Sequence, residues 1–288
     1  MKIELGTVQF GIPYGIANSK GQVEKKEAKN ILDYAKSSGI NSIDTAIAYG
    51  TSEKCLGEIG LDGFQVITKL PKIPDNYGNL KSWVQKHIKN SLSTLSVESL
   101  SGLLLHRPSQ LLDSDKNELW SILLRLKDEG LVKKIGFSIY TPSELDDLWN
   151  LYKPDLIQAP YSIFDRRLET SGWLERLYNE NVEIHIRSIF LQGLLLMNKN
   201  ARPKKFNKWL ELWNRWHDWL EDNNVSPLQA AVSFSISDNR IKKVTVGVDS
   251  LGQLKEVIAA SNSNINKFPQ DLNVEDTKLL NPSEWASL

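Results

Sequence analysis

The strongest constraint on the fold is an alternation of short apolar runs with amphipathic segments that continues along the whole chain. Eight apolar runs have the length of buried strands, and a helical pattern follows each of them. This alternation predicts parallel strands joined by right-handed crossovers. Eight such units in 288 residues favour an α/β fold of the (β/α)8 TIM-barrel type, with residues 1–288 forming a single domain.

The expected strands are residues 3–8, 41–43, 65–69, 102–105, 134–137, 156–158, 182–186 and 244–246. The expected helices include residues 25–38, 52–59, 80–95, 116–129, 143–151, 169–179, 205–223 and 251–260. A doubly wound dinucleotide-binding fold would carry Gly-x-Gly-x-x-Gly after the first strand, but residues 6–11 read GTVQFG. A polar stretch then leads into residues 262–288, which we expect to pack on the barrel as a C-terminal tail.

The composition limits the kinds of molecule that the chain is expected to bind. The chain has 35 Lys+Arg and 35 Asp+Glu, and this zero net charge argues against a nucleic-acid binder that neutralises phosphates. No apolar stretch approaches the ~20 residues of a membrane span, and the first ten residues do not form a signal peptide. We therefore expect a cytoplasmic protein with no nucleic-acid or membrane partner. A single cysteine, Cys55, excludes an intramolecular disulfide and a cysteine-based zinc cluster.

Polar side chains gather where three successive strands are expected to end. Asp44 ends the second strand, Lys69 the third, and His106 directly follows the fourth. Tyr49 lies on the loop after the second strand. Because the active sites of such barrels lie at the C-terminal strand ends, these four side chains are expected to meet at one rim.

The four residue types suit proton transfer to an oxygen atom. A phenol, with a pKa of about 10, is a proton donor at neutral pH, and a nearby ammonium lowers that pKa. Lys69 is therefore expected to lower the pKa of Tyr49, and Asp44 to position Lys69. His106 is expected to hydrogen-bond a substrate oxygen. No side chain supplies a hydride, so a cofactor would have to bring it.

The chain resembles the aldo-keto reductase family. The residues that carry this resemblance are Asp44-Thr45-Ala46, Ala48-Tyr49-Gly50, Ser52-Glu53, Leu56-Gly57, Thr68-Lys69, Leu105-His106-Arg107-Pro108 and Lys134-Ile135-Gly136-Phe137-Ser138. The resemblance implies that a small aldehyde or ketone is reduced to an alcohol by a nicotinamide cofactor. It implies that Tyr49 is the general acid, that Asp44 and Lys69 tune it, and that His106 orients the carbonyl. It implies no metal site.

The same resemblance implies cofactor-binding residues. Ser138 and Gln158 match positions that hold the carboxamide, Arg187 and Ser188 belong to the segment along the nicotinamide and pyrophosphate, and the loop from Gly247 through Ser250 to Gln253 reaches the adenosine ribose.

Three departures from the family pattern concern the cofactor. Ile139 replaces a common Asn, Arg187 replaces a stacking aromatic, and Gly247 and Gln253 stand where basic residues often clamp a 2′-phosphate. NADP (as NADPH) remains the family default, while NAD is open because Asp249 could favour a ribose diol.

Two other functions remain open. One is a cofactor-binding regulatory barrel with little turnover, resembling potassium channel beta subunits. The other is a metal-dependent barrel hydrolase or isomerase, although only Asp44 and His106 at the strand ends would suit a metal. For the reductase, Gln9, Asn18, Gln192 and Arg187 at the mouth favour a sugar or sugar derivative. The sequence fits a monomer or a homodimer.

Two further segments give structural expectations. Trp209, Trp213, Trp216 and Trp219 recur at helical spacing, which predicts an amphipathic helix packed on the barrel wall. Residues 192–206 form a long loop that we expect to wall the substrate pocket together with Trp83 or Tyr14. His87, His185 and His217 lack ligand spacing and are interpreted as structural.

Overall fold

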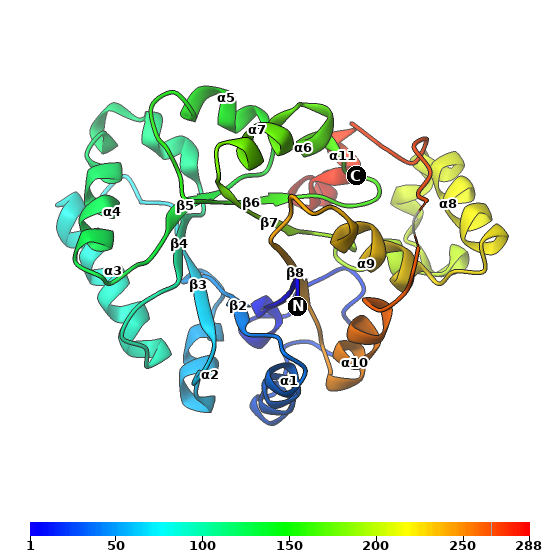
Figure 1. The fold of residues 1–288 in the computed structure, drawn as a ribbon, viewed down its shortest axis with the longest axis horizontal. Helices are drawn as coiled ribbons and strands as arrows, with labels where there is room; N and C mark the ends of the chain where they lie inside the picture. Colours follow the sequence, from blue (N-terminus) through cyan, green and yellow to red (C-terminus); the bar gives the residue numbers. More distant parts are fainter. Residues whose placement is uncertain (266) are drawn as a thin grey trace.

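The chain folds into a closed barrel of eight parallel strands in sequential order, as seen in the computed structural model, which describes residues 1–265 and 267–288 (Figure 1). Pairing of β1 with β8, from Ile3 opposite Val244 to Gly6 opposite Gly247, closes the barrel. The helices surround this barrel (Figure 1). The predicted single-domain (β/α)8 TIM barrel is therefore confirmed.

The strands are β1 Ile3–Gly6, β2 Ser42–Asp44, β3 Gln65–Leu70, β4 Gly102–Leu105, β5 Ile135–Ser138, β6 Leu156–Pro160, β7 Glu183–Arg187 and β8 Lys243–Gly247. The α-helices are α1 Lys25–Ser37, α2 Ser52–Ile59, α3 Leu80–Leu95, α4 Leu119–Asp128, α5 Ser143–Leu148, α6 Arg167–Thr170, α7 Trp173–Asn179, α8 Leu210–Asp222, α9 Pro227–Ser237, α10 Leu251–Ala260 and α11 Thr277–Leu280.

Several predicted helices differ from the observed ones; the helix expected over 205–223, for example, begins at Leu210, because Lys204–Trp209 forms a 3-10 helix. The helix expected over 169–179 is two helices, because Gly172 between α6 and α7 has a φ of 80° that ends regular helical geometry. The helix expected over 116–129 begins at Leu119, since Lys116 belongs to a preceding 3-10 turn and its ammonium binds Asp113 and Asp115.

Strand alternation divides the buried side chains into two sets. Successive residues of a strand point to opposite faces, so one set meets the surrounding helices and the other fills the barrel. Leu5, Ile43 and Leu103 belong to the large core shared with the helices, whereas Ile67, Leu104 and Leu156 form a separate apolar cluster. Asp44 and Lys69 each lie an even number of residues away from an inward-facing residue of the same strand. Their side chains therefore also point into the barrel.

Helix α8 lies outside the ring of helices (Figure 1) and buries part of the tryptophan stripe. Trp213 and Trp216 are fully buried against Phe164, and the Trp216 indole donates to the carbonyl of Leu195 at 3.2 Å. The predicted amphipathic character is confirmed, but Trp209 precedes the helix, and Trp213 and Trp216 pack on the loops after β6 and β7 instead of on the expected barrel wall.

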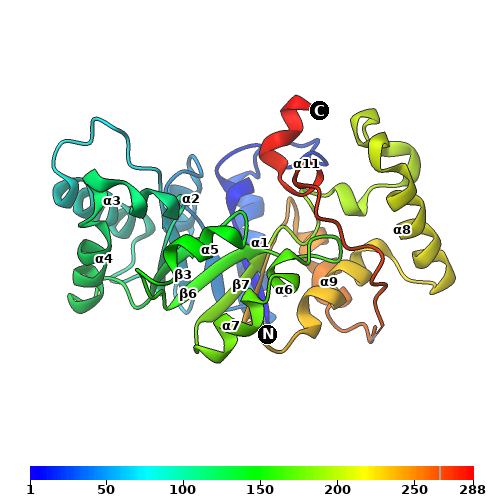
Figure 2. The ribbon, with the colours of Figure 1, turned by 90° about the horizontal axis from the view of Figure 1, so that it is seen from above.

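The C-terminal segment lies at the opposite end of the barrel from the N-terminus (Figure 2). Leu279, Leu280 and Trp285 are buried, and Trp285 packs edge-on against Phe206. This segment thus covers the end at which the strands terminate. No helix within the described residues has both the length and the apolar character that crossing a membrane requires.

Gly136 provides a test of strand packing, because a Cβ built at this position would lie 1.7 Å from the backbone oxygen of Leu156 in β6. We expect Gly136→Ala to lower the free energy of unfolding by several kcal/mol or to prevent folding, since backbone must move to relieve the overlap. The control is Gly252→Ala in α10, where the nearest atom would be Ser250 Oγ at 3.7 Å. Urea unfolding should give a change within about 1 kcal/mol for this control. Similar stabilities of the two variants would contradict the packing described.

Candidate active site

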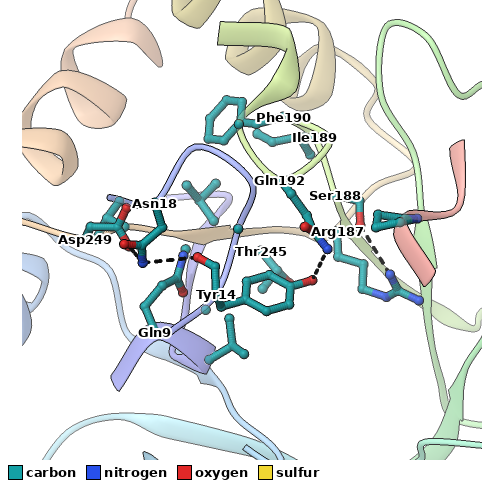
Figure 3. Close-up of a pocket in the computed structure, with 18 of the residues that line it drawn as sticks. Gln9, Tyr14, Asn18, Arg187, Ser188, Ile189, Phe190, Gln192, Thr245 and Asp249 are labelled. Atoms are coloured by element: carbon teal, nitrogen blue, oxygen red, sulfur yellow. Dashed lines mark hydrogen bonds between the residues drawn. The ribbon is translucent and has the colours of Figure 1, made fainter. Parts of the chain in front are cut away.

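A cavity of about 660 Å³ opens at the C-terminal ends of the strands. Its lining includes Tyr49 and His106, and it is within the size range of small-molecule and cofactor sites. Residues of the loops after β1, β7 and β8 line it as well, among them Gln9, Ser188 and Asp249 (Figure 3). Asn281, Pro282 and Ser283 of the C-terminal segment also contribute to the lining.

The loop that carries Tyr49 is fixed by neighbours from its own motif. The backbone N–H of Ser52 donates to the Tyr49 carbonyl at 3.0 Å. The hydroxyl of Ser52 donates to the carbonyl of Thr7 at 2.8 Å, and it lies 3.1 Å from the hydroxyl of Thr45. These buried bonds tie the loop to the end of β1.

Glu53 fixes helix α2 behind this loop. Its buried Oε1 accepts hydrogen bonds from the hydroxyls of Thr68 in β3 and Ser91 in α3, both at 2.7 Å. Ser52 and Glu53 of the sequence motif are therefore structural supports of Tyr49.

Asp44 and Lys69 form an ion pair inside the barrel. The Lys69 Nζ donates to Asp44 Oδ1 at 2.6 Å and to the Thr45 carbonyl at 3.0 Å, and the two side chains are 1% and 5% exposed, respectively. Burial lowers the pKa of Lys69, but Asp44 and Tyr49 raise it by more, so the lysine stays protonated. For Asp44, burial raises the pKa and Lys69 opposes that rise.

Lys69 lowers the pKa of Tyr49, as expected, but the expectation that this pKa falls below its ordinary value is wrong for this structure. The Lys69 Nζ lies 5.2 Å from the centroid of the Tyr49 ring and does lower the pKa of the phenol. Burial raises that pKa by more, so it lies above the ordinary value of 10.0. The phenol is accordingly protonated at neutral pH, and the lysine limits the cost of forming phenolate.

His106 lies beside Tyr49 as a neutral ring. The two ring centroids are 5.9 Å apart with the planes at 77°. Burial and the positive charges of Lys69, Arg187 and Arg107 lower the pKa of His106 to about 3. A neutral imidazole can donate one hydrogen bond to an oxygen placed between it and the phenol.

Two residues predicted for the cofactor carboxamide lie beneath the cavity rather than on its surface. Ser138 and Gln158 are 1% and 0% exposed, and neither is among the residues that line the cavity. The Gln158 amide donates to Asp44 Oδ1 at 2.7 Å. In this structure Gln158 therefore orients Asp44, and its predicted contact with a cofactor stays a prediction.

A second charged group inside the barrel was missed by the sequence analysis, which interpreted His185 as structural. His185 Nδ1 lies 3.1 Å from Glu4 Oε2, and its Nε2 lies 2.8 Å from Glu183 Oε1. Burial would lower the pKa of His185, but Glu4 and Glu183 raise it to about 9, so the ring is protonated at neutral pH. Burial raises the pKa of Glu4, but His185 and the hydroxyls of Ser42 and Thr245 bring it down to about 2.

Hydrogen bonds link this lower group to the ion pair above it. The Thr245 hydroxyl donates to Glu4 Oε2 at 2.7 Å and accepts from the Gln158 amide at 3.4 Å. Gln158 in turn donates to Asp44. A continuous polar chain thus runs from Glu4 in β1 to the catalytic candidates at the rim.

The same cavity also has the features of a cofactor site. Its lining includes four of the predicted cofactor residues, Arg187, Ser188, Gly247 and Gln253, whereas Ser250 caps helix α10 by accepting from the backbone N–H of Gln253.

Two observations at Gln9 indicate that a polar ligand fits this side. Gln9 is 9% exposed, and its buried Oε1 has no hydrogen-bond partner among the described residues. A Cβ at position 247 would come within 2.5 Å of the Gln9 amide, so glycine leaves room there for close approach. The residues present therefore fit a nicotinamide cofactor.

The loop after β7 forms part of the wall, as expected, with Tyr14. Gln192, Gly193 and Leu196 line the cavity, and the Gln192 amide donates to the Tyr14 hydroxyl at 3.1 Å (Figure 3). The expectation for Trp83 is wrong, because this residue stacks on His87 within α3 and does not line the cavity.

In the part of the chain that the structure describes, no three His, Cys, Asp or Glu side chains gather in a way that could hold a metal ion.

Comparison with known proteins identifies the family. The model of the Aldo/keto reductase family matches residues 2–271. The chain belongs to the aldo/keto reductase family. The sequence-based resemblance is thereby confirmed, and the barrel is that of an oxidoreductase family whose members act on small carbonyl compounds.

Two distant relatives and one solved structure match this chain over almost their whole length. The protein named Uncharacterized oxidoreductase YqkF of Bacillus subtilis (strain 168) is 25% identical over 283 residues, covering 91% of this chain and 91% of the relative. The NADH-specific methylglyoxal reductase of Escherichia coli (strain K12) is 23% identical, covering 92% and 91%. The structure of aldo-keto reductase AKR11C1 from Bacillus halodurans (holo form) matches with a TM-score of 0.73 and 20% identity, covering 92% of this chain and 88% of that one.

The charged group below the ion pair predicts a pH dependence of stability. The pKa of His185 is about 9 in the folded chain and about 6.5 when unfolded, so its contribution is complete below pH 6.5 and is lost as the pH rises through 9. We expect the free energy of unfolding, measured with urea, to fall by roughly 3 kcal/mol between pH 6 and pH 9.5.

The variant His185→Gln should be less stable at pH 6 and show a shallower fall. His87→Gln, altered outside the barrel interior, serves as the matched control and should keep the wild-type dependence. Equal pH dependence in the wild type and His185→Gln would mean that His185 is uncharged in the folded barrel.

Proposed function

We propose that this member of the aldo/keto reductase family reduces an aldehyde or ketone to an alcohol with NAD(P)H. The observation that supports it most is the arrangement of a protonated Tyr49 phenol and a neutral His106 in one cavity above the Asp44–Lys69 ion pair. These side chains can deliver a proton to an oxygen and stabilise the charge left behind, as carbonyl reduction requires.

When bound, the reduced nicotinamide supplies the hydride that the carbonyl carbon accepts. The chain's own residues handle the oxygen. His106 donates a hydrogen bond to it, and Tyr49 transfers its phenolic proton to it. As the phenolate forms, Lys69 stabilises the negative charge, while Asp44 keeps the ammonium oriented and balances its charge when the phenol is protonated.

The cofactor would lie along the residues between Tyr49 and the start of α10. Gln9, Ser188, Gly247 and Gln253 line that path. The earlier assignments of Ser138, Gln158 and Ser250 to the cofactor are retained as proposals, with Gln158 reached only if its amide turns from Asp44.

Negative charge at the end of the cavity near α10 favours NADH, whereas the family resemblance implies NADPH. Asp249 and Glu256 line the cavity there, and Glu27 Oε1 accepts from the backbone N–H of Leu251 at the start of α10. Lys20 is the cation that acts on Asp249 and Glu27. Carboxylates accept hydrogen bonds from ribose hydroxyls and repel a phosphate, so the balance supports a ribose diol.

Replacement of the phenol tests the proposed proton donor. Tyr49→Phe should lower kcat for aldehyde reduction by a factor of about 10² to 10⁴, because the proton then has to come from water. Its affinity for NADH, measured by calorimetry, should stay within about threefold. Tyr178→Phe, at an exposed position of α7, is the control and should keep wild-type kcat. Wild-type turnover in Tyr49→Phe would remove Tyr49 as the acid, and cofactor binding without turnover of any carbonyl compound by the wild type would favour the regulatory alternative.

The cofactor choice is tested by equilibrium binding without substrate. We expect the wild type to bind NADH about tenfold or more tightly than NADPH, and Asp249→Asn to reduce this ratio by weakening the repulsion of the 2′-phosphate. Asp222→Asn at the exposed end of α8 should leave the ratio unchanged. A wild type that prefers NADPH would contradict this assignment and support the family default.

A further inference from the structure

The cavity of the proposed reductase separates charge between its two sides. Asp249 lies on one side and Arg187 on the other, with Tyr14 and Gln192 between them (Figure 3). Among the described residues that line the cavity, Arg187 is the one with a positive charge, because His106 is neutral. The negative charge of Asp44 is compensated by Lys69, which lies beneath the cavity. Arg187 shares the cavity with Tyr49 and His106, and its charge acts on both.

The Arg187 guanidinium is fixed in position, but its charge is not compensated. Its Nη2 donates to the Ile139 carbonyl at 3.0 Å, and its Nη1 donates to the Ser188 hydroxyl at 3.2 Å. Both acceptors are neutral, and within the described residues no carboxylate forms an ion pair with Arg187. A guanidinium has five N–H donors, so others remain for a ligand, and little further ordering is needed to use them.

A second arginine lies on the same aromatic ring. The guanidinium carbons of Arg187 and Arg107 are 4.8 Å and 4.4 Å from the centroid of Tyr140. Arg107 is exposed and likewise lacks an ion pair in the described part of the chain. Glu144, the carboxylate nearest to Tyr140 in sequence, accepts hydrogen bonds from the backbone N–H groups of Tyr140 and Thr141 at 2.6 Å and 3.0 Å.

The positive charge reaches the reacting groups. Arg187 and Arg107 both contribute to the low pKa of His106, and Arg187 lowers that of Tyr49. Asp249, a carboxylate that could offset this field in the cavity, lies on the other side (Figure 3), and Glu256 lies in α10, the helix that begins after Asp249 and Ser250. An anionic group on the molecule being reduced would meet an uncompensated, preorganised guanidinium close to the carbonyl site.

We propose that Arg187, supported by Arg107 at the rim, binds a carboxylate or phosphate group of the substrate, so that the enzyme reduces anionic aldehydes or ketones. This inference rests on the reductase function proposed above and assigns Arg187 to the substrate rather than to the cofactor. Carboxylates and phosphates both present paired oxygens that match the fork of a guanidinium, whereas a neutral sugar would leave its charge unmatched.

The test compares pairs of substrates in which one member carries an anionic group and the other is neutral. One pair is 4-carboxybenzaldehyde with its neutral amide, 4-carbamoylbenzaldehyde, and the other is glyceraldehyde 3-phosphate with glyceraldehyde. We expect the wild type with NADH or NADPH to favour the anionic member of at least one pair by tenfold or more in kcat/KM. The favoured pair identifies which anion the site takes.

Variants connect this preference to the arginine. Arg187→Gln should lower kcat/KM for the anionic substrate by tenfold or more and leave the neutral one within threefold. Arg187→Lys keeps the charge without the fork and should retain part of the preference. Arg125→Gln, which removes an exposed charge from α4, is the matched control and should retain all of it.

Binding measured by calorimetry separates this inference from the reductase function. The wild type should bind 4-(hydroxymethyl)benzoate tenfold or more tightly than 4-(hydroxymethyl)benzamide, whether or not turnover occurs. If no carbonyl compound is reduced, the reductase function fails, and this binding ratio still decides the anion site. Equal rates and equal affinities for charged and neutral members overturn the anion site alone. An Arg187→Gln variant that loses NADH affinity and keeps the substrate preference overturns it as well, because the guanidinium then serves the cofactor.

Discussion

The buried ion pair between Asp44 and Lys69 is the interaction on which the site depends. Two opposite charges with exposures of 5% and 1% lie 2.6 Å apart, and removing either would leave an uncompensated charge in the barrel interior. The pairing of β2 with β3, which sets Asp44 opposite Ile67, fixes the strand register from which Lys69 reaches back to the carboxylate. The geometry at the phenol is therefore a consequence of strand register, and the loops supply the other side of the cavity.

The barrel interior below that pair is more polar than the interior of a typical (β/α)8 barrel, which is filled mainly by branched apolar side chains. Lys69 and Asp44 are followed downward by Glu4, His185 and Glu183, and Lys134 binds the last of these. Positive and negative groups are equal in number along this path. The balance explains how so many buried charges are tolerated, since each has a partner of opposite sign or a hydrogen-bond donor.

The barrel and the four residues at its rim could be predicted because both can be recognised from residues that are close in sequence. Apolar runs of strand length indicated the eight βα units, and Asp44 and Lys69 lie where strands end. Glu4 and His185 could not be placed in the same way. Glu4 is a single polar residue between Ile3 and Leu5, and His185 follows Glu183 in an alternating strand, and their contact exists only because closure brings β1 beside β8 and β7 beside β8. The sign of the shift at Tyr49 was missed for a related reason, because the degree of burial depends on the whole cavity.

Barrel closure has a consequence for the order in which the chain can fold. Glu4 lies in the first strand, and the Ser42 hydroxyl that donates to it is 38 residues away, but the cation that compensates its charge, His185, is 181 residues away and Thr245 is 241 residues away. During synthesis this carboxylate has to remain hydrated until β7 and β8 have been made, since burying it alone is unfavourable. The charge thus opposes premature collapse around the first strands, and the edge of β1 stays available until its last partner emerges from the ribosome.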